Sequence, residues 1–183
     1  MEKDFFDRDP KIVARDLLGK KLVHEEHDGR VSGIIVETEA YYTKTDKASH
    51  TFYRPSALKF FLNNLPGTAY VYFTYGNHWM LNVLTKDGAV LFRALEPVEG
   101  IKKMKIRRKT SEIKKLSNGP GKLAQALGIN GAHNGLHFAE KKIFVKETNL
   151  APQIVEATRI GITRDSHKKL RFYIKGNEFV SKK

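Results

Sequence analysis

The sequence predicts an α+β fold with a single domain over residues 1–183, built on a curved, mostly antiparallel sheet with flanking helices. A length of 183 residues is enough for one well-filled core and short for two domains. Apolar runs of strand length recur along the chain, and turns containing glycine, asparagine or aspartate separate several of them, which is typical of antiparallel hairpins. Segments with helix start and stop signals lie between these runs, so both element types contribute to one core.

The first element expected is a short helix after residue 9. Asp9 precedes Pro10, and proline suits the first position of a helix. Apolar residues at helical spacing follow, and Gly19 is expected to end the helix. A strand over 21–26 and a second one over 30–42 come next, with a hairpin turn at Asp28-Gly29 between them.

Three further strands are expected after the mixed segment 43–66. They cover residues 68–76, 78–85 and 89–97, and turns at Gly76-Asn77 and Asp87-Gly88 separate them. Since each turn is short, the three strands form an antiparallel meander.

The second half of the chain is expected to hold two helices followed by more strands. Pro97 and Glu99 open a basic helix over 97–109, and another helix begins after residue 122 and stops near Gly128. Strands are expected over 142–147, 155–163 and 170–176, where β-branched and aromatic residues gather.

Charge is the unusual feature of the composition. The chain has 33 Lys and Arg against 20 Asp and Glu, a formal net charge of +13, which favours polyanionic partners and nucleic acid above all. An anionic membrane is the second possibility, but no basic amphipathic helix or long apolar run supports it. Because there is no cysteine, disulfides, zinc-thiolate fingers and iron–sulfur clusters are excluded. No signal peptide or spanning segment is expected.

The stretch IIVETEAYY, residues 34–42, ends an apolar run with two carboxylates and two tyrosines. Side chains alternate along a strand, so Ile35, Glu37, Glu39 and Tyr41 are expected on one face. A carboxylate beside an aromatic wall becomes a better base when it is partly desolvated, and it stabilises positive charge on a bound substrate. The alternative is a strand that runs out into solvent, where acids and tyrosines are common.

Three other positions combine polar groups with strand-like surroundings. Tyr75 stands before the turn at Gly76-Asn77, where an exposed aromatic is a candidate wedge between stacked bases. The alternative is an aromatic that packs in the core or on the surface. Arg93 is a lone cation in an apolar strand and needs a partner, either a protein carboxylate such as Glu96 or a substrate phosphate. Asn82, in another apolar strand, is open to the same two interpretations.

Six motifs then occur in order along the chain: VETEAY, DKASH, YVYFTYG with the later Asn82, LFRALEP, NGPGKLAQALGI and LRFYIKG. Each is weak alone, but together they resemble the alkyladenine (3-methyladenine) DNA glycosylase family, from about residue 12 to residue 180. The resemblance implies a base-excision repair enzyme that flips a damaged purine out of double-stranded DNA and hydrolyses its bond to deoxyribose. Alkylated or deaminated purines are the implied substrates: 3-methyladenine, 7-methylguanine, hypoxanthine and ethenoadenine.

The resemblance also assigns roles to single residues. Glu39 matches the catalytic acid that deprotonates or orients water, and Arg93 an arginine near that water and a backbone phosphate. Tyr75 matches the aromatic that intercalates where the flipped nucleotide was. Glu39 can act in this way only if it stays ionised next to the sugar and no internal guanidinium occupies it. The positions that match the family's base pocket are Tyr41, His50, Tyr72 and Asn82, the last of which screens unmodified guanine.

These roles agree with the chemistry of glycosidic bond cleavage. A nearby carboxylate lowers the barrier because the sugar gains oxocarbenium character. Alkylation at N3 or N7 makes the purine cationic, and a cation over an aromatic face gains roughly 0.5–2 kcal/mol. Only one carboxylate is required, so Glu37 is expected to be a structural acid that pairs with a basic neighbour.

Basic residues elsewhere are candidates for binding DNA phosphates. Arg107 and Arg108 lie in a run of cations between residues 102 and 115, which is either a phosphate track or a solvated helix face. Gly121 and Lys122 lie where a helix begins after Asn118, and free N–H groups there can hold a phosphate. Simple capping of this helix by Ser117 or Asn118 is the alternative, and the resemblance favours phosphate binding.

No metal or cofactor is expected. His133 and His137 are four residues apart, but Asn134-Gly135 between them favours a turn over a helix that presents two ligands. The resemblance implies no cofactor either. A lysine nucleophile would make the enzyme a lyase, yet the pocket positions contain no lysine, so a monofunctional glycosylase is expected.

Segment 51–66 departs from the family, which carries a Thr-x-Arg-Asn stretch here, whereas this chain has Arg54-Pro55-Ser56 and a helix-like run. The range of accepted lesions is therefore the least determined property.

A non-catalytic nucleic-acid-binding module of the same fold is the alternative function. We expect a monomer, because flipping one nucleotide needs no two-fold symmetry. The expected location is the cytoplasm, near the nucleoid, in a bacterium and the nucleus in a eukaryote.

Overall fold

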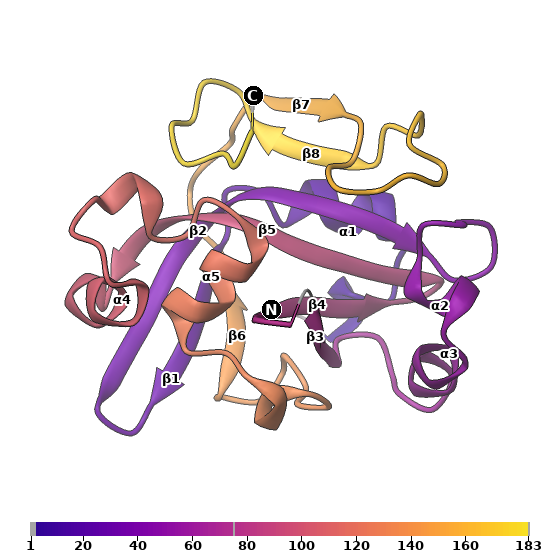
Figure 1. Cartoon of the computed structure of the whole chain (residues 1–183), viewed down its shortest axis with the longest axis horizontal. Coiled ribbons are helices and arrows are strands. Elements are labelled where there is room, and N and C mark those ends of the chain that lie inside the picture. The colour runs from indigo at the N-terminus through magenta and orange to yellow at the C-terminus, as the bar shows by residue number, and fades with distance from the viewer. Residues whose placement is uncertain (1–2, 75, 183) are drawn as a thin grey trace.

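The computed structural model describes residues 3–74 and 76–182, and a single eight-stranded sheet organises them (Figure 1). Every strand pair in it is antiparallel, which confirms the predicted fold class. The neighbours along the sheet run β3-β4-β5-β2-β1-β6, and β8 pairs with both β2 and β7. The strands are β1 (Lys21–Glu26), β2 (Gly29–Tyr42), β3 (Ala69–Thr74), β4 (His78–Thr85), β5 (Gly88–Glu99), β6 (Ile143–Lys146), β7 (Ile154–Ala157) and β8 (Arg171–Ile174). That the whole chain is one domain stays a prediction.

Strand β2 is the centre of this arrangement. Its 14 residues pair with β5 along one edge, while β1 borders the first half of the other edge and β8 the second half. Figure 1 shows β2 and β5 crossing the molecule side by side. The residues at the end of β2 are therefore held from both sides.

Helices flank the sheet along its length and at its ends. They are α1 (Pro10–Asp16), α2 (His50–Tyr53), α3 (Pro55–Leu62), α4 (Ile101–Arg108) and α5 (Pro120–Leu127), with short 3-10 turns that include η3 (Gly131–His133). In Figure 1, α4 lies at one end and α2 and α3 at the other, while α5 lies near the middle, where it packs against β4 and β5. None of the helices in residues 3–74 and 76–182 has the length and apolar character to cross a membrane.

The first helix begins as its sequence predicts. The Asp9 carboxylate accepts a hydrogen bond from the backbone N–H of Lys11 at 2.8 Å, and Pro10 occupies the first turn. A cap of this kind stabilises a helix by about 1 kcal/mol. Helix α1 then packs against β2, where the Thr38 hydroxyl donates to the Ala14 carbonyl.

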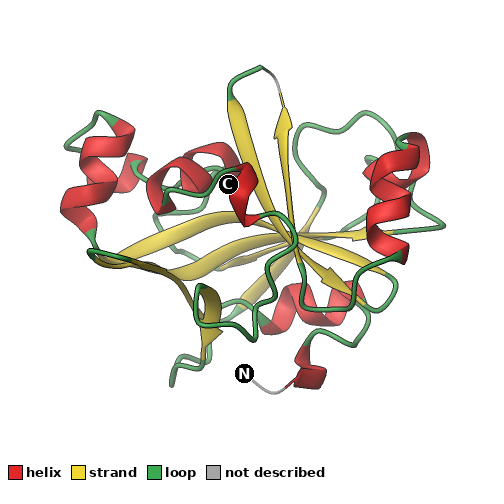
Figure 2. Ribbon diagram, turned by 90° about the horizontal axis from the view of Figure 1, so that it is seen from below, coloured by secondary structure: helices red, strands yellow, loops and turns green. Residues whose placement is uncertain are grey.

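The predicted hairpins are confirmed, but two of their turns lie one residue earlier than expected. Glu26 pairs with Gly29 and Thr85 with Gly88, so each glycine already belongs to its strand. At Gly88 the reason is a close approach of two backbones. A Cβ there would lie 2.0 Å from the Tyr41 carbonyl oxygen, and only glycine fits. The β3–β4 hairpin projects from the body of the molecule in Figure 2.

Two boundaries in the second half differ from the prediction. The helix expected over 97–109 begins only at Ile101, because β5 continues through Pro97 to Glu99. Pro97 pairs with Gly33 beside a register shift, and irregular positions of this kind tolerate a proline within a sheet. The strand expected over 155–163 ends at Ala157, because the chain then turns so that the Ile160 N–H reaches Glu39.

A bulge in the middle of β2 breaks the expected alternation of its side chains. Ile35 pairs with Leu95 and Glu37 with Ala94, so Val36 has no opposite residue in β5. Ile35 and Ala40 both join the main core, while Val36 packs in a small second cluster with Ala94 and Val180. The expectation that Ile35 shares a face with Glu37 and Glu39 is therefore wrong. An extra residue in one strand shifts the alternation by one position.

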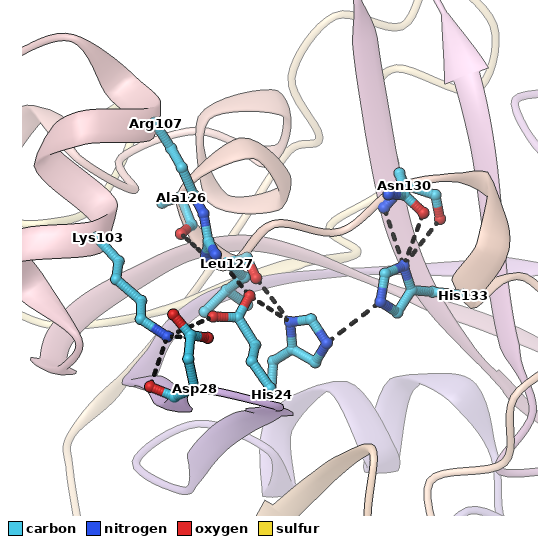
Figure 3. A network of polar contacts seen from close by, with 9 residues as sticks. His24, Asp28, Lys103, Arg107, Ala126, Leu127, Asn130 and His133 are labelled. Atoms are coloured by element: carbon cyan, nitrogen blue, oxygen red, sulfur yellow. Dashed lines mark hydrogen bonds and ion pairs between the residues drawn. The ribbon is translucent and has the colours of Figure 1, made fainter.

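A buried polar chain joins β1 to α5 and η3 (Figure 3). The Nδ1 of His24 lies 2.7 Å from the Leu127 carbonyl, and a carbonyl only accepts, so this nitrogen carries the proton. The Nε2 of His24 then accepts from the Nε2 of His133 at 3.2 Å. The Nδ1 of His133 accepts in turn from the Asn130 N–H at 3.1 Å. The carbonyl oxygen and the side-chain oxygen of Asn130 lie 3.2 and 3.1 Å from the same nitrogen, so Asn130 surrounds this end of the chain.

The histidines considered as metal ligands have other partners. His133 contacts His24, and the Nε2 of His137 lies 2.9 Å from the Pro66 carbonyl. Gly135 has a φ of +89°, which confirms the turn expected between them.

Candidate active site

An aromatic cavity opens where β2, β3, β4 and β5 meet α2. Its volume is about 420 Å³, which is within the range of small-ligand sites. The rings along its wall come from four elements: Tyr41, His50, Tyr53, Phe61, Tyr70 and Tyr72. A flat, apolar ligand that stacks on aromatic faces fits such a wall.

The rings contact one another and so support each other's orientation. The centroids of His50 and Tyr72 are 4.1 Å apart at an interplanar angle of 53°, and those of Tyr70 and Tyr72 are 5.3 Å apart. The Nδ1 of His50 lies 3.2 Å from the Tyr70 hydroxyl. Behind Tyr41, the guanidinium of Arg159 lies 4.5 Å from the ring centroid. The ligand-binding wall is therefore packed before any ligand arrives.

Most of the predicted pocket residues are brought together here. Tyr41, His50, Tyr72, Asn82 and Arg93 all line the cavity. Glu39 does not line it, since its side chain is 0% exposed. Tyr75, the predicted wedge, lies outside the described residues.

Glu39 is bonded on both carboxylate oxygens. One oxygen accepts from the Tyr41 hydroxyl at 2.8 Å and from the Arg93 guanidinium at 3.2 Å, and the other accepts from the Ile160 N–H at 2.8 Å. All three donors line the cavity, so the carboxylate lies directly behind its wall. The sequence-based hypothesis required a carboxylate free of an internal guanidinium. Arg93 contacts one oxygen, so that oxygen does not meet the requirement, whereas the oxygen bonded to Ile160 has a single donor and keeps lone-pair capacity for another.

Arg93 reaches this position because β5 is irregular there. Ala94 pairs with Glu37 and Phe92 with Thr38, which leaves Arg93 without an opposite residue. Its guanidinium contacts Glu37 and Glu39, each at 3.2 Å. Glu96, suggested as its partner, accepts instead from Asn177, so that suggestion is wrong.

The expectation that Glu37 is a structural acid is supported by its contacts. Besides Arg93, it accepts from the Arg171 guanidinium at 2.9 Å and from the Ser181 N–H at 2.7 Å. Two buried carboxylates thus face two buried guanidinium groups. Balanced pairing of this kind is what makes buried charge tolerable.

Burial raises the pKa of Glu39 above its ordinary value of 4.5, while Arg93 and the Ile160 and Tyr41 hydrogen bonds oppose the shift. A carboxylate with a raised pKa is a stronger base. Burial also raises the pKa of the Tyr41 hydroxyl far above its usual range, and the neighbouring Glu39 charge adds to that shift. The hydroxyl therefore stays protonated and donates to Glu39.

His50, Tyr70 and Tyr72 are uncharged at neutral pH. Burial lowers the pKa of His50 to about 4, and the Arg54 charge contributes. Burial raises the pKa of Tyr70 and of Tyr72. A cationic ligand in the cavity thus meets neutral aromatic faces, which attract it.

Asn82 is fixed by the hydrogen bond from its amide nitrogen to the Tyr70 carbonyl at 3.0 Å. The side chain is 5% exposed and lines the cavity. Its amide group therefore occupies a set place in the pocket and limits the shape of what can enter.

The family model for methylpurine-DNA glycosylases matches residues 4–178 of this chain. The chain belongs to the methylpurine-DNA glycosylase family.

Relatives agree with this membership. A protein of Prosthecochloris aestuarii is 44% identical over 98% of this chain and 90% of its own length, and one of Salinibacter ruber is 42% identical over 97% and 94%. One of Clostridium perfringens is 43% identical over 99% and 98%. Each carries the name "Putative 3-methyladenine DNA glycosylase". The family expected from the six motifs is confirmed, and the names support a DNA glycosylase for alkylated bases.

In this member of the methylpurine-DNA glycosylase family, the beginning of α5 lies beside the cavity, where Pro120 lines the wall. None of the described side chains caps this end of the helix. The Ser117 hydroxyl donates to Leu95, and the Asn118 side chain accepts from Lys122 at 2.9 Å. The expected alternative, capping by Ser117 or Asn118, is therefore not what the structure has. Phosphate binding by Gly121 and Lys122 stays a prediction.

Arg107 and Arg108 lie on α4 and are held by protein groups. Arg107 donates to Glu26 at 2.6 Å and to the Ala126 carbonyl, and Arg108 donates to the Leu116 carbonyl at 3.1 Å. These contacts tie α4 to its neighbours. Phosphate binding by either residue stays a prediction. A phosphate would have to compete with these protein groups for the guanidinium N–H donors.

Sequence reasoning missed the residues from the last third of the chain that bond the buried carboxylates of Glu37, Glu39 and Asp46. Arg159 forms a buried ion pair with Asp46 at 2.8 Å, and Ile160 and Arg171 bond Glu39 and Glu37. A possible signal was an arginine in each of two expected strands, since a buried arginine needs a carboxylate partner. The partners are more than 100 residues away, and local pattern gives no means of choosing them.

Proposed function

We propose that this protein is a monofunctional DNA glycosylase of base-excision repair that removes alkylated purines, 3-methyladenine among them, by hydrolysis of the N-glycosidic bond. Membership of the methylpurine-DNA glycosylase family supports the reaction class. The observation that carries the mechanism is the Glu39 carboxylate, which is held behind an aromatic cavity by three groups that line it.

The cavity suits a flat cationic base. Alkylation at N3 or N7 gives the purine a positive charge, and a cation over a neutral ring gains about 0.5–2 kcal/mol. Tyr41, His50 and Tyr72 provide such rings. Since the cavity is concave and the base is stacked inside duplex DNA, the nucleotide must turn out of the helix to enter. Intercalation of Tyr75 into the gap remains part of the proposal.

Glu39 acts on the sugar side of the bond. As the base departs, the deoxyribose gains positive charge, which the carboxylate stabilises while it orients or deprotonates water. The oxygen bonded only to Ile160 is the one with acceptor capacity left for that water. Arg93, which lines the cavity, positions Glu39 and faces the phosphate and water side of the nucleotide. The hydrolysis uses these side chains and water, and no cofactor is proposed.

Selectivity among lesions follows from shape. Asn82 is fixed in the wall, so it opposes the 2-amino group of guanine, at a position where adenine carries only hydrogen. 3-Methyladenine, hypoxanthine and ethenoadenine avoid this contact, while 7-methylguanine relies on its charge to offset it. Double-stranded DNA with such a lesion is the proposed partner of a monomeric enzyme.

The decisive experiment measures base release under single-turnover conditions from duplexes that carry one lesion each. Glu39→Gln keeps the size of the side chain and removes its charge, so excision should fall by about 100-fold or more, as expected for loss of a general base. Excision within about threefold of the parent contradicts the role of Glu39. Trapping of a covalent protein–DNA adduct by borohydride contradicts water as the nucleophile.

A second candidate is a nucleic-acid-binding module that performs no chemistry. The observation that favours it is the complete burial of Glu39 and its contact with Arg93, which suit a structural acid. The same variant separates the two candidates. A module binds lesion DNA equally well as the parent protein and as the Glu39→Gln variant, and it releases no base in either form.

A further inference from the structure

A second hollow continues from the aromatic cavity on the side of Tyr53. Its volume is about 300 Å³. The two spaces share a wall that consists of Ala48, Tyr53, Gly161 and Ile162. A ligand that extends from the cavity past this shared wall therefore enters the second hollow.

The other lining residues of the second hollow are Lys47, Thr163 and Arg164. Two are cations and one is a hydroxyl, while no carboxylate of the described residues lines the hollow. Within residues 3–74 and 76–182, neither Lys47 Nζ nor the Arg164 guanidinium has a hydrogen bond or an ion pair. Both side chains are exposed. By contrast, Lys168 on the same loop is paired with Asp165, so the two free cations are available to a ligand.

The hollow is held open by bonds between the two loops that form it. Asp165 adopts a left-handed conformation with a φ of +49°. Its carboxylate accepts from the Lys47 N–H at 2.9 Å and from Lys168 Nζ at 2.8 Å, while Lys168 Nζ also donates to the Thr45 carbonyl. Figure 1 shows the loop between β7 and β8 extending beside the segment that leads to α2.

A deeper bond fixes the same two loops. Asp46, next to Lys47, pairs with Arg159 at 2.8 Å, and both side chains are almost fully buried. The bonds of Asp165 and the Asp46–Arg159 ion pair thus fix the two loops that carry Lys47 and Arg164. A left-handed aspartate costs of order 1 kcal/mol. The bonds that Asp165 forms in this conformation connect the two loops.

We propose that this hollow binds a phosphodiester that flanks the flipped nucleotide, with Lys47 and Arg164 as its cationic contacts and Thr163 as a hydroxyl donor. This inference rests on the proposed function, since the base in the cavity brings the phosphate to the hollow. Charge-assisted hydrogen bonds from lysine and arginine are the usual means of holding a phosphate. The contact places the nucleotide and carries no base information.

The first test uses the parent protein alone. A duplex with one hypoxanthine on a 2′-fluorinated sugar, which keeps the base and resists hydrolysis, is bound at increasing salt, with a neutral methylphosphonate at the 5′ or at the 3′ flanking position. One of the two replacements should lower the salt slope by about 0.9, which makes the affinity about 3.5-fold less sensitive between 50 and 200 mM salt. An equal small effect at both positions overturns the assignment to a flanking phosphate.

The second test combines this DNA with the double variant Lys47→Ala, Arg164→Ala. The variant should reproduce the lower slope on ordinary DNA and show no further loss with the sensitive methylphosphonate. Lys44→Ala, Lys169→Ala is the matched control, because both lysines are exposed on the same loops and neither lines the hollow. Equal losses in the two variants, or additive losses with the methylphosphonate, overturn the proposal.

The binding readout separates this inference from the proposed function. If the parent releases no base from any lesion duplex, the proposed function fails, and the salt slopes still show whether the hollow holds a phosphate. If base release occurs and the slopes are unchanged, only the inference fails. Thermal unfolding midpoints of the two double variants show whether either is misfolded.

Discussion

The carboxylate of Glu39 is held by groups from β2, β5 and the loop after β7. The VETEAY motif, through the family resemblance, singled out Glu39 as the candidate catalytic acid. Tyr41, two positions on, was expected beside it. The contacts of Glu39 with Arg93 and Ile160 were not expected, because one depends on a strand irregularity and the other on a residue 121 positions away. Residue identity is local information, whereas the chemistry of a buried carboxylate depends on its non-local partners.

The acid side of the pH profile tests the state of Glu39. Its pKa is raised above 4.5 by burial, and the proposed mechanism needs the ionised form. Base release should therefore fall tenfold per pH unit on an acid limb whose midpoint lies above pH 4.5, as for one essential group. The measurement is the single-turnover rate on a hypoxanthine duplex, whose base is uncharged.

His50 provides the contrasting outcome. Its pKa is lowered to about 4, so a limb with its midpoint near that value would follow the imidazole and contradict control by Glu39. The variant His50→Gln serves as the control, because it should leave the midpoint of the limb in place.

At the scale of elements, the sequence predicted the hairpins well and the irregularities poorly. Turns depend on residues such as Gly29 and Asp28 that act locally, so β1, β2 and the meander were placed within a few residues. The bulge at Val36 and the unpaired Arg93 arise from the pairing of two strands, which one strand's pattern does not contain. Helix α4 was predicted too early for the same reason, since β5 pairs with β2 through Pro97.

Gly88→Ala tests the close approach of β5 to β2 at the active-site end. The new Cβ would lie 2.0 Å from the Tyr41 carbonyl oxygen, so the strands must separate. The free energy of unfolding should fall by about 3 kcal/mol, the upper part of the usual range for overpacking. Urea unfolding measures this change, and base release should also decline because Tyr41 moves.

Gly176→Asn is the matched control. Gly176 has a φ of +75°, and a Cβ added there would have none of the described atoms within 4 Å, while asparagine tolerates this conformation. The control should unfold within about 1 kcal/mol of the parent. A similar result for Gly88→Ala would show that the two strands separate easily.

Over the whole molecule, the net charge of +13 indicated a polyanionic partner but did not identify the cations that would contact it. It agrees with a DNA glycosylase family, but it does not show which cations are free. Arg107 is engaged by Glu26, while Lys47 and Arg164 line the hollow beside the cavity. Only the folded chain distinguishes cations that hold the protein together from those left for DNA, because ion pairs join distant segments.

Acid sensitivity of the fold is expected from the histidine chain of Figure 3. Burial lowers the pKa of His24 and of His133 below the ordinary 6.5, with opposing contributions from Glu26 and supporting ones from Lys142. The unfolded chain binds these protons below pH 6.5 and the folded chain resists them. The free energy of unfolding should therefore be highest above pH 6.5 and decrease as the pH falls below 6.5.

Urea unfolding at pH 7.5 and pH 5 measures this dependence. His24→Leu leaves the Leu127 carbonyl without its donor, so it should be less stable at pH 7.5 and also less sensitive to acid. His27→Gln is the control, because His27 is exposed in the turn after β1 and should keep the parent's dependence. An unchanged slope in His24→Leu would place the acid sensitivity elsewhere.

The partners of Glu37 come from positions 93, 171 and 181, and this order has a consequence during synthesis. When β2 and β5 have both left the ribosome, the carboxylates of Glu37 and Glu39 have Arg93 as their only guanidinium partner among these strands. Negative charge is then in excess between the two strands. The second guanidinium and the Ser181 amide emerge about 80 residues later. Nascent chains should thus hold an unfinished, hydrated charge cluster until translation of this region is almost done, and only then acquire repair competence.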